Sequence, residues 1–428
     1  GDNPKNITKI YDTYEDSRKG FVNYGGWLAS SIDSLKNSST GILKLTDSGG
    51  KEQINFPSDS TLYLSVTDSD RNTNSGTQET ITATITSETE TTGESLTLTE
   101  TGVNTGIFIG TIAFETNSSF TSGDSKLQVQ KGDRLIGSYV DPSNLAGNKD
   151  TLEVLAYYDI TLKSGLINEN TTWTKADSPY LVTGDITVPN VTTLTIKPGS
   201  EIRFMPTDDR ATGRDRARSE LYVYGTLIAN GTAADSIIFT SAVVSPSYGD
   251  WHGINISDNK ANVSLKYNRI EYSTYGLYMN HIGNANNDID TIRVTNNRIH
   301  TTGRGIYEYG SKSNFIIEDN RFDDIYGEGL YFNDLNESYV KIRKNILNNV
   351  RGGGIIVSNK KIVEISHNMI DGKENESTNG IRIDNSNKDV IVGNNTIKNV
   401  SGYGIELRYS ESTNNQWKVV NNIVKDNA

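Results

Sequence analysis

Residues 297–308 read NRIHTTGRGIYE, and residues 320–332 repeat the same phrase as NRFDDIYGEGLYF. In each phrase an apolar residue stands two places after an asparagine, and a glycine followed by isoleucine or leucine comes after a turn. The alternation of apolar and polar residues in both halves predicts short β-strands rather than the stripe of a helix. The two phrases therefore indicate a repeated β unit that begins again every 23 residues at this point.

The same two markers recur through the C-terminal part of the chain. Glycine followed by isoleucine or leucine returns with a period close to that of the asparagine, at Gly276, Gly305, Gly329, Gly354, Gly380 and Gly404. Two markers with one period predict a β-solenoid in which each repeat is a coil stacked on the next. We expect the glycines to permit tight corners and the asparagine amides to form a hydrogen-bonded ladder inside the stack. The ladder asparagines are Asn268, Asn297, Asn320, Asn345, Asn368, Asn395 and Asn422.

Short apolar strands also precede these repeats. They include Ile186-Thr187-Val188, Leu194-Thr195-Ile196, Ile202-Arg203-Phe204 and Trp251-His252-Gly253-Ile254. This stretch resembles the entry coils of the right-handed parallel β-helix family, the pectin-lyase-like fold, and with the repeats the resemblance covers residues 176–428. It implies a right-handed parallel β-helix. Because the family includes lyases, hydrolases, epimerases, tailspikes and non-catalytic surface proteins, it does not decide the function.

The net charge of −12 is concentrated at the N-terminal end of the chain. Residues 1–162 carry 22 acidic and 12 basic residues, a net of −10, and the remainder carries 31 and 29, a net of −2. This asymmetry predicts two different modules. The acidic balance argues against a nucleic-acid partner, and the absence of cysteine excludes disulfide scaffolds and thiol catalysis. No apolar run approaches the roughly 20 residues of a membrane span.

Short Thr-rich strands between residues 41 and 162 predict an antiparallel β-sandwich. The segment 67–112 resembles immunoglobulin-like modules of large prokaryotic surface proteins. The predicted fold class is therefore all-β, an immunoglobulin-like sandwich followed by a β-helix. We assign residues 1–40 to an N-terminal extension and residues 163–175 to a linker.

One loop of the acidic module has alternating oxygen side chains, which can converge on a hard cation such as Ca²⁺. A carboxylate at the twelfth position can close the shell, as in an EF-hand loop, although the sixth position is Thr73 rather than glycine. The alternative is an Asx-rich turn that caps its own backbone. The predicted calcium ligands are Asp68, Asp70, Asn72, Asn74 and Glu79, and Glu100 and Asp141 are further candidates.

Three columns of the solenoid are expected to face solvent. One contains Glu271, His300 and Asp323, and Arg321 belongs to the column beside it. Stacking at about 4.8 Å places Glu271 and Asp323 about 9.6 Å apart, near the upper end of the spacing of inverting glycosidases. These residues are candidates for a catalytic site, and the alternative is that they form structural charge pairs.

The third column consists of tyrosines that could act as stacking platforms for saccharide rings, Tyr278, Tyr307 and Tyr331. The charged loop from Asp208 to Arg218 is expected to be a solvated excursion that could line a site. His252 is expected to follow a core tryptophan without a chemical role.

We predict an extracellular structural or adhesive protein of a bacterial or archaeal surface, such as an S-layer, sheath or filament subunit, rather than an enzyme. Asn-x-Ser/Thr sequons such as Asn37 and Asn190 are compatible with a glycosylated exterior protein. No capping segment follows the Asn422 strand, so we expect self-association or a longer polypeptide beyond residue 428. The alternatives are a polysaccharide lyase, hydrolase or epimerase, or a protein that binds cell-surface polysaccharide.

Overall fold

The computed structural model describes residues 39–116, 123–257, 261–280, 291–333, 338–373, 376–385, 389–408 and 416–425. These residues form β-strands, turns and one short 3-10 turn, η2 (Ser69–Arg71). They divide into two compact units between Ile160 and Thr161. Within the described ranges no helix is long and apolar enough to cross a membrane. The expected N-terminal extension lies almost wholly outside the described residues.

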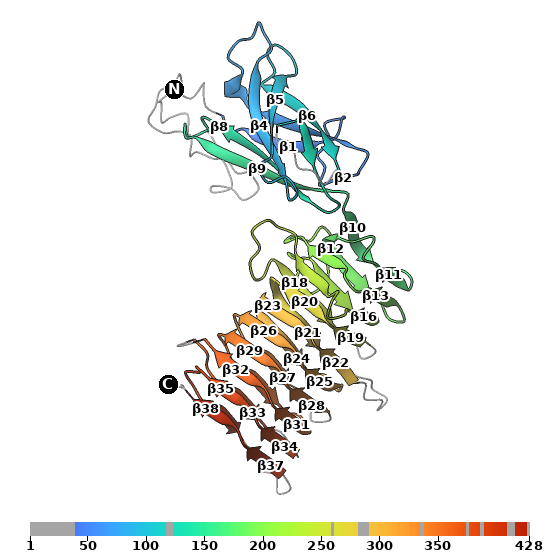
Figure 1. Ribbon diagram of the computed structural model, residues 1–428, viewed down its shortest axis with the longest axis vertical. Helices are drawn as coiled ribbons and strands as arrows, with labels where there is room; N and C mark the ends of the chain where they lie inside the picture. Colours follow the sequence, from blue (N-terminus) through green and yellow to red (C-terminus); the bar gives the residue numbers. More distant parts are fainter. Residues whose placement is uncertain are drawn as a thin grey trace, which may run out of the picture. The chain divides into compact units, whose positions relative to one another are not determined.

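The N-terminal unit contains one nine-stranded sheet in the order β1-β3-β6-β5-β4-β8-β9-β2, with β7 paired to β6 (Figure 1). Most neighbouring strands are antiparallel, but β2 pairs with β9 and β7 with β6 in parallel. The sheet curls so that β1 contacts β8 and β9, and a separate apolar core fills the curl. The strands are β1 (Ile42–Thr46), β2 (Asn55–Phe56), β3 (Thr61–Thr67), β4 (Thr80–Ser87), β5 (Glu94–Glu100), β6 (Ile107–Glu115), β7 (Lys126–Gln128), β8 (Arg134–Asp141) and β9 (Asp150–Tyr158).

This arrangement differs from the predicted antiparallel sandwich, because the strands share one mixed, curled sheet. The strands themselves follow the sequence pattern, since β3 and β4 alternate buried and exposed residues. Such alternation shows that one face of a strand is buried but does not determine which strands pair. The immunoglobulin-like resemblance therefore remains a prediction.

The C-terminal unit is a parallel β-solenoid whose coils each contribute three strands (Figure 1). In this solenoid β10 (Thr161–Leu166) pairs with the long strand β12 (Tyr180–Val188). The start and the end of β12 then pair with the first strands of two columns of stacked strands. The first column contains β14 (Glu201–Phe204), β17 (Ile237–Ser241), β20 (Asn268–Glu271), β23 (Arg298–Thr302), β26 (Arg321–Ile325), β29 (Ile346–Val350), β32 (Met369–Gly372), β35 (Thr396–Lys398) and β38 (Ile423–Lys425).

The second and third columns complete each coil. The second contains β15 (Glu220–Val223), β18 (Trp251–Ile256), β21 (Ser273–Asn280), β24 (Arg304–Tyr309), β27 (Leu330–Asn333), β30 (Ile355–Ser358), β33 (Ile381–Asp384) and β36 (Ile405–Arg408). The third is a separate ten-stranded sheet of β11 (Thr171–Trp173), β13 (Thr193–Ile196), β16 (Thr226–Asn230), β19 (Asn262–Lys266), β22 (Thr291–Thr295), β25 (Asn314–Glu318), β28 (Tyr339–Arg343), β31 (Ile362–Ser366), β34 (Asp389–Gly393) and β37 (Gln416–Val420). Because β10 and β11 belong to the solenoid sheets, residues 163–175 contribute strands where the sequence predicts a linker.

Equivalent apolar residues of successive coils stack into one continuous core. Ile270, Ile299, Phe322 and Leu347 pair in register along the first column, and none of these side chains is exposed. Full burial of a side chain of this size stabilises a fold by about 1.5–3 kcal/mol relative to its exposed state. The repeated apolar positions are therefore the main source of solenoid stability.

The corners of the coils do not depend on the repeated glycines in the way the sequence predicts. The left-handed conformation falls instead on the residue before each ladder asparagine, for example Asn296 with φ 57° and Lys344 with φ 56°. The glycines are required by close approach, because a Cβ atom at Gly329 would lie 2.7 Å from the carbonyl oxygen of Gly354 on the next coil. The glycines thus form a column without room for side chains.

Candidate functional site

The seven predicted asparagines form a ladder along the inside of one corner. Nδ2 of each of the first six, from Asn268 to Asn395, donates a hydrogen bond to Oδ1 of the asparagine on the next coil, at 2.8–3.0 Å. Each Nδ2 also donates to a carbonyl of the third column, such as that of Val294 for Asn320. Six of the seven side chains are almost fully buried, and Asn422 is partly exposed. The asparagines thus tie each coil to the next and two sheets to each other.

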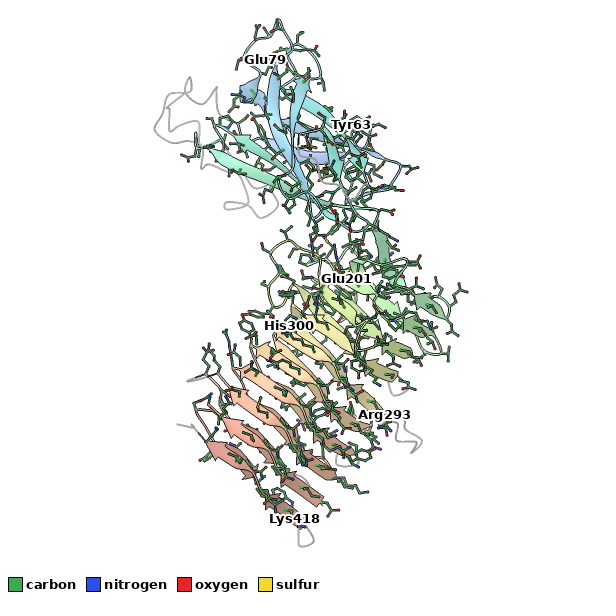
Figure 2. The ribbon with its side chains drawn as sticks, viewed as in Figure 1. Tyr63, Glu79, Glu201, Arg293, His300 and Lys418 are labelled. Carbon is green, nitrogen blue, oxygen red and sulfur yellow. The ribbon has the colours of Figure 1, made fainter. Side chains whose placement is uncertain are left out.

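The column of candidate catalytic residues is mostly buried rather than facing solvent. Glu271 is 6% exposed and accepts hydrogen bonds from Thr240 Oγ1 at 2.7 Å and His300 Nε2 at 2.5 Å, and its carboxylate lies 3.0 Å from Arg269 Nε. Figure 2 shows His300 on its solenoid strand. Burial of Glu271 favours the protonated form, but the hydrogen bonds from His300 and Thr240 outweigh it and lower the pKa. This carboxylate is held ionised by partners on three coils.

Asp323 is held in the same way. It is 4% exposed, and its Oδ2 atom lies 2.7 Å from Arg321 Nε and 3.1 Å from Arg298 Nε. Burial of Asp323 raises its pKa, but the hydrogen bond and charge of Arg321 more than compensate, so the pKa is lowered. His300 lies in register between Glu271 and Asp323, one coil from each. The structure brings these residues together as an ion-pair network, without a protonated carboxyl.

The predicted tyrosine column forms a stack. Tyr307 lies between Tyr278 and Tyr331, with ring centroids 5.6 and 4.6 Å apart and nearly parallel planes. Tyr278 is only 5% exposed, because the guanidinium of Arg214 covers its ring at 3.9 Å. Arg304 lies over Tyr307 at 5.3 Å. The expectation that this column faces solvent is therefore wrong for Tyr278.

The structure gathers three carboxylates at the candidate calcium site. Oxygens of Asp68, Asp70 and Asp141 lie within 4.8 Å of one another, and Asp68 and Asp141 are buried. Burial of Asp70, with its neighbour Asp68, raises its pKa to about 6. Asp68 also accepts a hydrogen bond from the Tyr139 hydroxyl at 2.7 Å. Carboxylate oxygens at this spacing suit Ca²⁺, which binds oxygen ligands at about 2.3–2.6 Å.

The other predicted calcium ligands are not part of this group. Glu79, labelled in Figure 2, accepts hydrogen bonds from the backbone of Thr73 and Asn74 and closes its own loop. Asn74 accepts from Gly76, and Asn72 donates to Asn104. Glu100 accepts from the backbone of Thr105 and Gly106. The loop side chains of Glu79 and Asn74 bind their own backbone rather than converging on one point, and Asp141 from β8 supplies the third carboxylate.

Sequence reasoning missed a second buried polar group, which we call the capped cluster: Asp185, Glu220, His252 and Asn255. These side chains are 1%, 0%, 5% and 1% exposed. Burial raises the pKa of Glu220 to about 7 and that of Asp185 to about 6, and burial lowers the pKa of His252 to about 4. One feature of the sequence could have indicated this cluster: Asp185 is an acidic residue within the otherwise largely apolar strand β12.

A loop with four arginines covers this cluster. Thr212 Oγ1 donates to Asp185 at 2.8 Å, and the backbone N–H of Arg214 donates to Glu220. Asp208 accepts from the backbone N–H of Asp185 at 3.1 Å. The charged loop expected to be a solvated excursion is therefore fastened to the solenoid by buried carboxyls.

Comparison with protein families agrees with this architecture. A family model described as a right-handed β-helix region matches residues 227–376 and 336–428. A model described as a pectate-lyase-like β-helix domain matches residues 165–276. No curated protein matches the chain. The two family models together span residues 165–428, the same part of the chain that forms the stacked parallel coils. The protein therefore belongs to the right-handed parallel β-helix repeat family.

Proposed function

We propose that this protein is an extracellular structural or adhesive component of a bacterial or archaeal surface, in which the β-helix serves as a stiff rod. The observation that carries the proposal is that charged side chains of the β-helix bind one another within and between coils. The predicted catalytic carboxylates are each held by partners from more than one coil: Glu271 by Arg269, His300 and Thr240, and Asp323 by Arg298 and Arg321. Acids held ionised in this way stabilise the stack and do not offer a proton to a substrate.

Further ion pairs support the same interpretation. Lys398 pairs with Asp371 at 2.7 Å and Arg343 with Glu318 at 3.4 Å, and each pair joins neighbouring coils. Exposed pairs of this kind contribute little one at a time, but they resist sliding of one coil over another when they are repeated along the rod. A ladder of buried amides inside and ion pairs outside favours a role in mechanical stability.

We also propose that calcium stabilises the N-terminal unit. Asp68, Asp70 and Asp141 bring three carboxylates together, and burying like charges this close is costly unless a cation or protons compensate. A module that depends on calcium suits an exterior protein without cysteine, because calcium is a substitute for disulfide bonds in stabilising a small domain.

The proposal is tested by location and by turnover. Antibodies against the purified protein should label intact cells of the source organism, and protease treatment of intact cells should remove the signal. Purified protein should release no product from a broad panel of polysaccharides. Turnover by the wild type that is lost in Glu271→Gln or Asp323→Asn, with Lys398→Gln as a folded control, would make this face an active site and refute the proposal.

A further inference from the structure

An ion pair in the corner that follows β30 differs from the pairs described above, because it is fully buried. Lys360 Nζ lies 3.2 Å from Glu308 Oε2, and neither side chain has any exposed surface. In the ion pairs of Arg321 and Lys398, by contrast, the cationic side chain is 49% and 32% exposed. Taking both charges of a pair out of water is costly, and their mutual attraction offsets this cost only where the geometry is excellent. The solenoid therefore keeps these two groups together at a cost that an exposed pair avoids.

The pair reaches across an intervening coil. Glu308 lies on β24 and is in register with Phe332 of β27, which is in register with Val357 of β30 (Figure 1). Lys360 follows the end of β30 by two residues, so its side chain extends back past the β27 coil to reach Glu308. The asparagine ladder joins each coil only to its neighbour, whereas this contact holds three successive coils together.

Backbone donors fix both oxygens of the Glu308 carboxyl. The backbone N–H of Ser311 donates to Oε1 at 2.8 Å, and that of Asn333 donates to Oε2 at 3.1 Å. Backbone N–H groups placed in this way stabilise the negative charge that develops on a carboxyl oxygen when a nucleophile adds to the carboxyl carbon. The surroundings of Glu308 therefore suit attack on its carbon as well as an ion pair.

The amine is positioned equally closely. Lys360 Nζ donates to Ser338 Oγ at 3.1 Å and lies 4.8 Å from the centre of the Phe315 ring. Ser338 is 1% exposed and Phe315 has no exposed surface. A nitrogen nucleophile, a carboxyl group and a hydroxyl that can pass on a proton thus lie together in a place closed to bulk water. Well-oriented groups of this kind react as if their concentration were about 10⁵–10⁸ M.

We propose that Lys360 and Glu308 condense to form an amide bond between their side chains, a covalent cross-link within the β-helix. Transfer of one proton from Nζ to Oε2 converts the ion pair to an amine and a carboxylic acid, and a dry site favours uncharged groups. The Nζ lone pair then attacks Cδ, and a proton passes from Nζ through Ser338 Oγ to the departing hydroxyl. The N–C bond forms, the C–O bond breaks and one water molecule leaves, so no oxidant, reductant or cofactor is required.

Burial favours the linked form over the ion pair. The reaction removes two charges from a site without exposed surface, and hydrolysis would need water to return to that site. The cross-link also closes a loop of the chain from residue 308 to residue 360, and such a closure stabilises a fold by restricting the unfolded chain, as a disulfide does. A chain without cysteine would gain a covalent brace in this way.

The test is mass spectrometry of the full chain. The intact protein should be lighter than its sequence by one water molecule. Trypsin does not cleave after an acylated lysine, so a digest of the unfolded protein should contain residues 305–312 joined to residues 352–361 as one branched peptide. An intact mass equal to that of the sequence overturns the proposal, and so does recovery of residues 305–312 and 352–360 as separate peptides.

Variants assign the reaction to its groups. Lys360→Met removes the nucleophile and should have the full mass of its sequence, whereas Lys361→Met, a change at the exposed neighbouring lysine, is the matched control and should still lack one water. Ser338→Ala should form the bond at least about 100-fold more slowly, and a linked fraction equal to that of the wild type at early times would refute the proton relay. Should Lys360→Met not fold, the peptide map of the wild type decides alone. These outcomes are independent of where the protein is located.

Discussion

Replacing Asn320 by alanine should destabilise the solenoid from within its ladder. The change removes the acceptor of the Asn297 backbone N–H and Nδ2, at 2.9 and 3.0 Å, and the donor to the Val294 carbonyl at 2.8 Å. Asn297 Nδ2 keeps its bonds to two carbonyls, so one backbone N–H loses its acceptor and one carbonyl loses a donor, both in a buried place. At about 1–3 kcal/mol for each unsatisfied buried group, the expected loss of unfolding free energy is about 3 kcal/mol.

The assay is thermal unfolding followed by circular dichroism, together with hydrogen exchange resolved by coil. For a unit of this size a loss of about 3 kcal/mol lowers Tm by roughly 6–12 °C. Asn348→Ala is the matched control, because Asn348 is partly exposed and makes one long bond of 3.4 Å to Asp323. Asn422→Ala, at the partly exposed last rung, should cost less than Asn320→Ala. Equal melting temperatures for Asn320→Ala and Asn348→Ala would refute the role assigned to the ladder.

Further outcomes follow from other contacts. Chelation of calcium, or Asp141→Asn, should lower the melting temperature of the N-terminal unit alone, and calorimetric traces that are identical with and without chelator would contradict the proposed calcium site. The pKa of Asp323 is lowered in the folded protein, so ionised Asp323 stabilises the solenoid at pH values above about 3.9, its usual pKa, and this stabilisation is lost as pH falls. In urea unfolding, Asp323→Asn should therefore lower the free energy of unfolding more at pH 7 than at pH 3. The pKa of Glu220 is raised to about 7 in the folded protein, so the wild type loses free energy of unfolding as pH rises from about 4.3 towards 7. The Glu220→Gln variant should therefore have the same Tm as the wild type at pH 4 and a higher Tm at pH 8. Gly329→Ala would push a Cβ to 2.7 Å from the Gly354 carbonyl oxygen and should cost about 1–3 kcal/mol, and a Tm equal to that of the wild type would show that the coils can separate.

The solenoid could be predicted because its determinants repeat. Any one asparagine is weak evidence, but a residue that returns with the period of the coil reports directly on what stacks above and below it. The N-terminal sheet has no such repetition. The alternation in β3 and β4 predicts strands, whereas the curl and the parallel pairing of β2 with β9 depend on contacts between distant segments.

Many residues of the candidate sites can be predicted from the sequence, but the burial of their side chains cannot. The period of the repeat predicts the columns to which Glu271 and Tyr278 belong. That Arg214 covers the ring of Tyr278 depends on how the loop folds, which the repeat does not determine. The sequence places Asp68 and Asp70 in one loop and offers Asp141 only as a further candidate, because Asp141 lies on β8, distant in sequence, and folding alone brings it close. The capped cluster combines β12, β15 and β18 in the same way, so its members carry no common local motif.

The ladder has a consequence for how the molecule can change its length. Each of the first six rungs is an asparagine that donates to the asparagine of the next coil, so these coils offer their neighbours the same surface. Deleting residues 320–344 would bring Asn297 next to Asn345 and leave a ladder of the same form. A deletion that is not a whole coil would shift the strand register and turn apolar side chains outward. Insertions and deletions within the rod should therefore be tolerated in whole coils, and the length of the protein can vary only in steps.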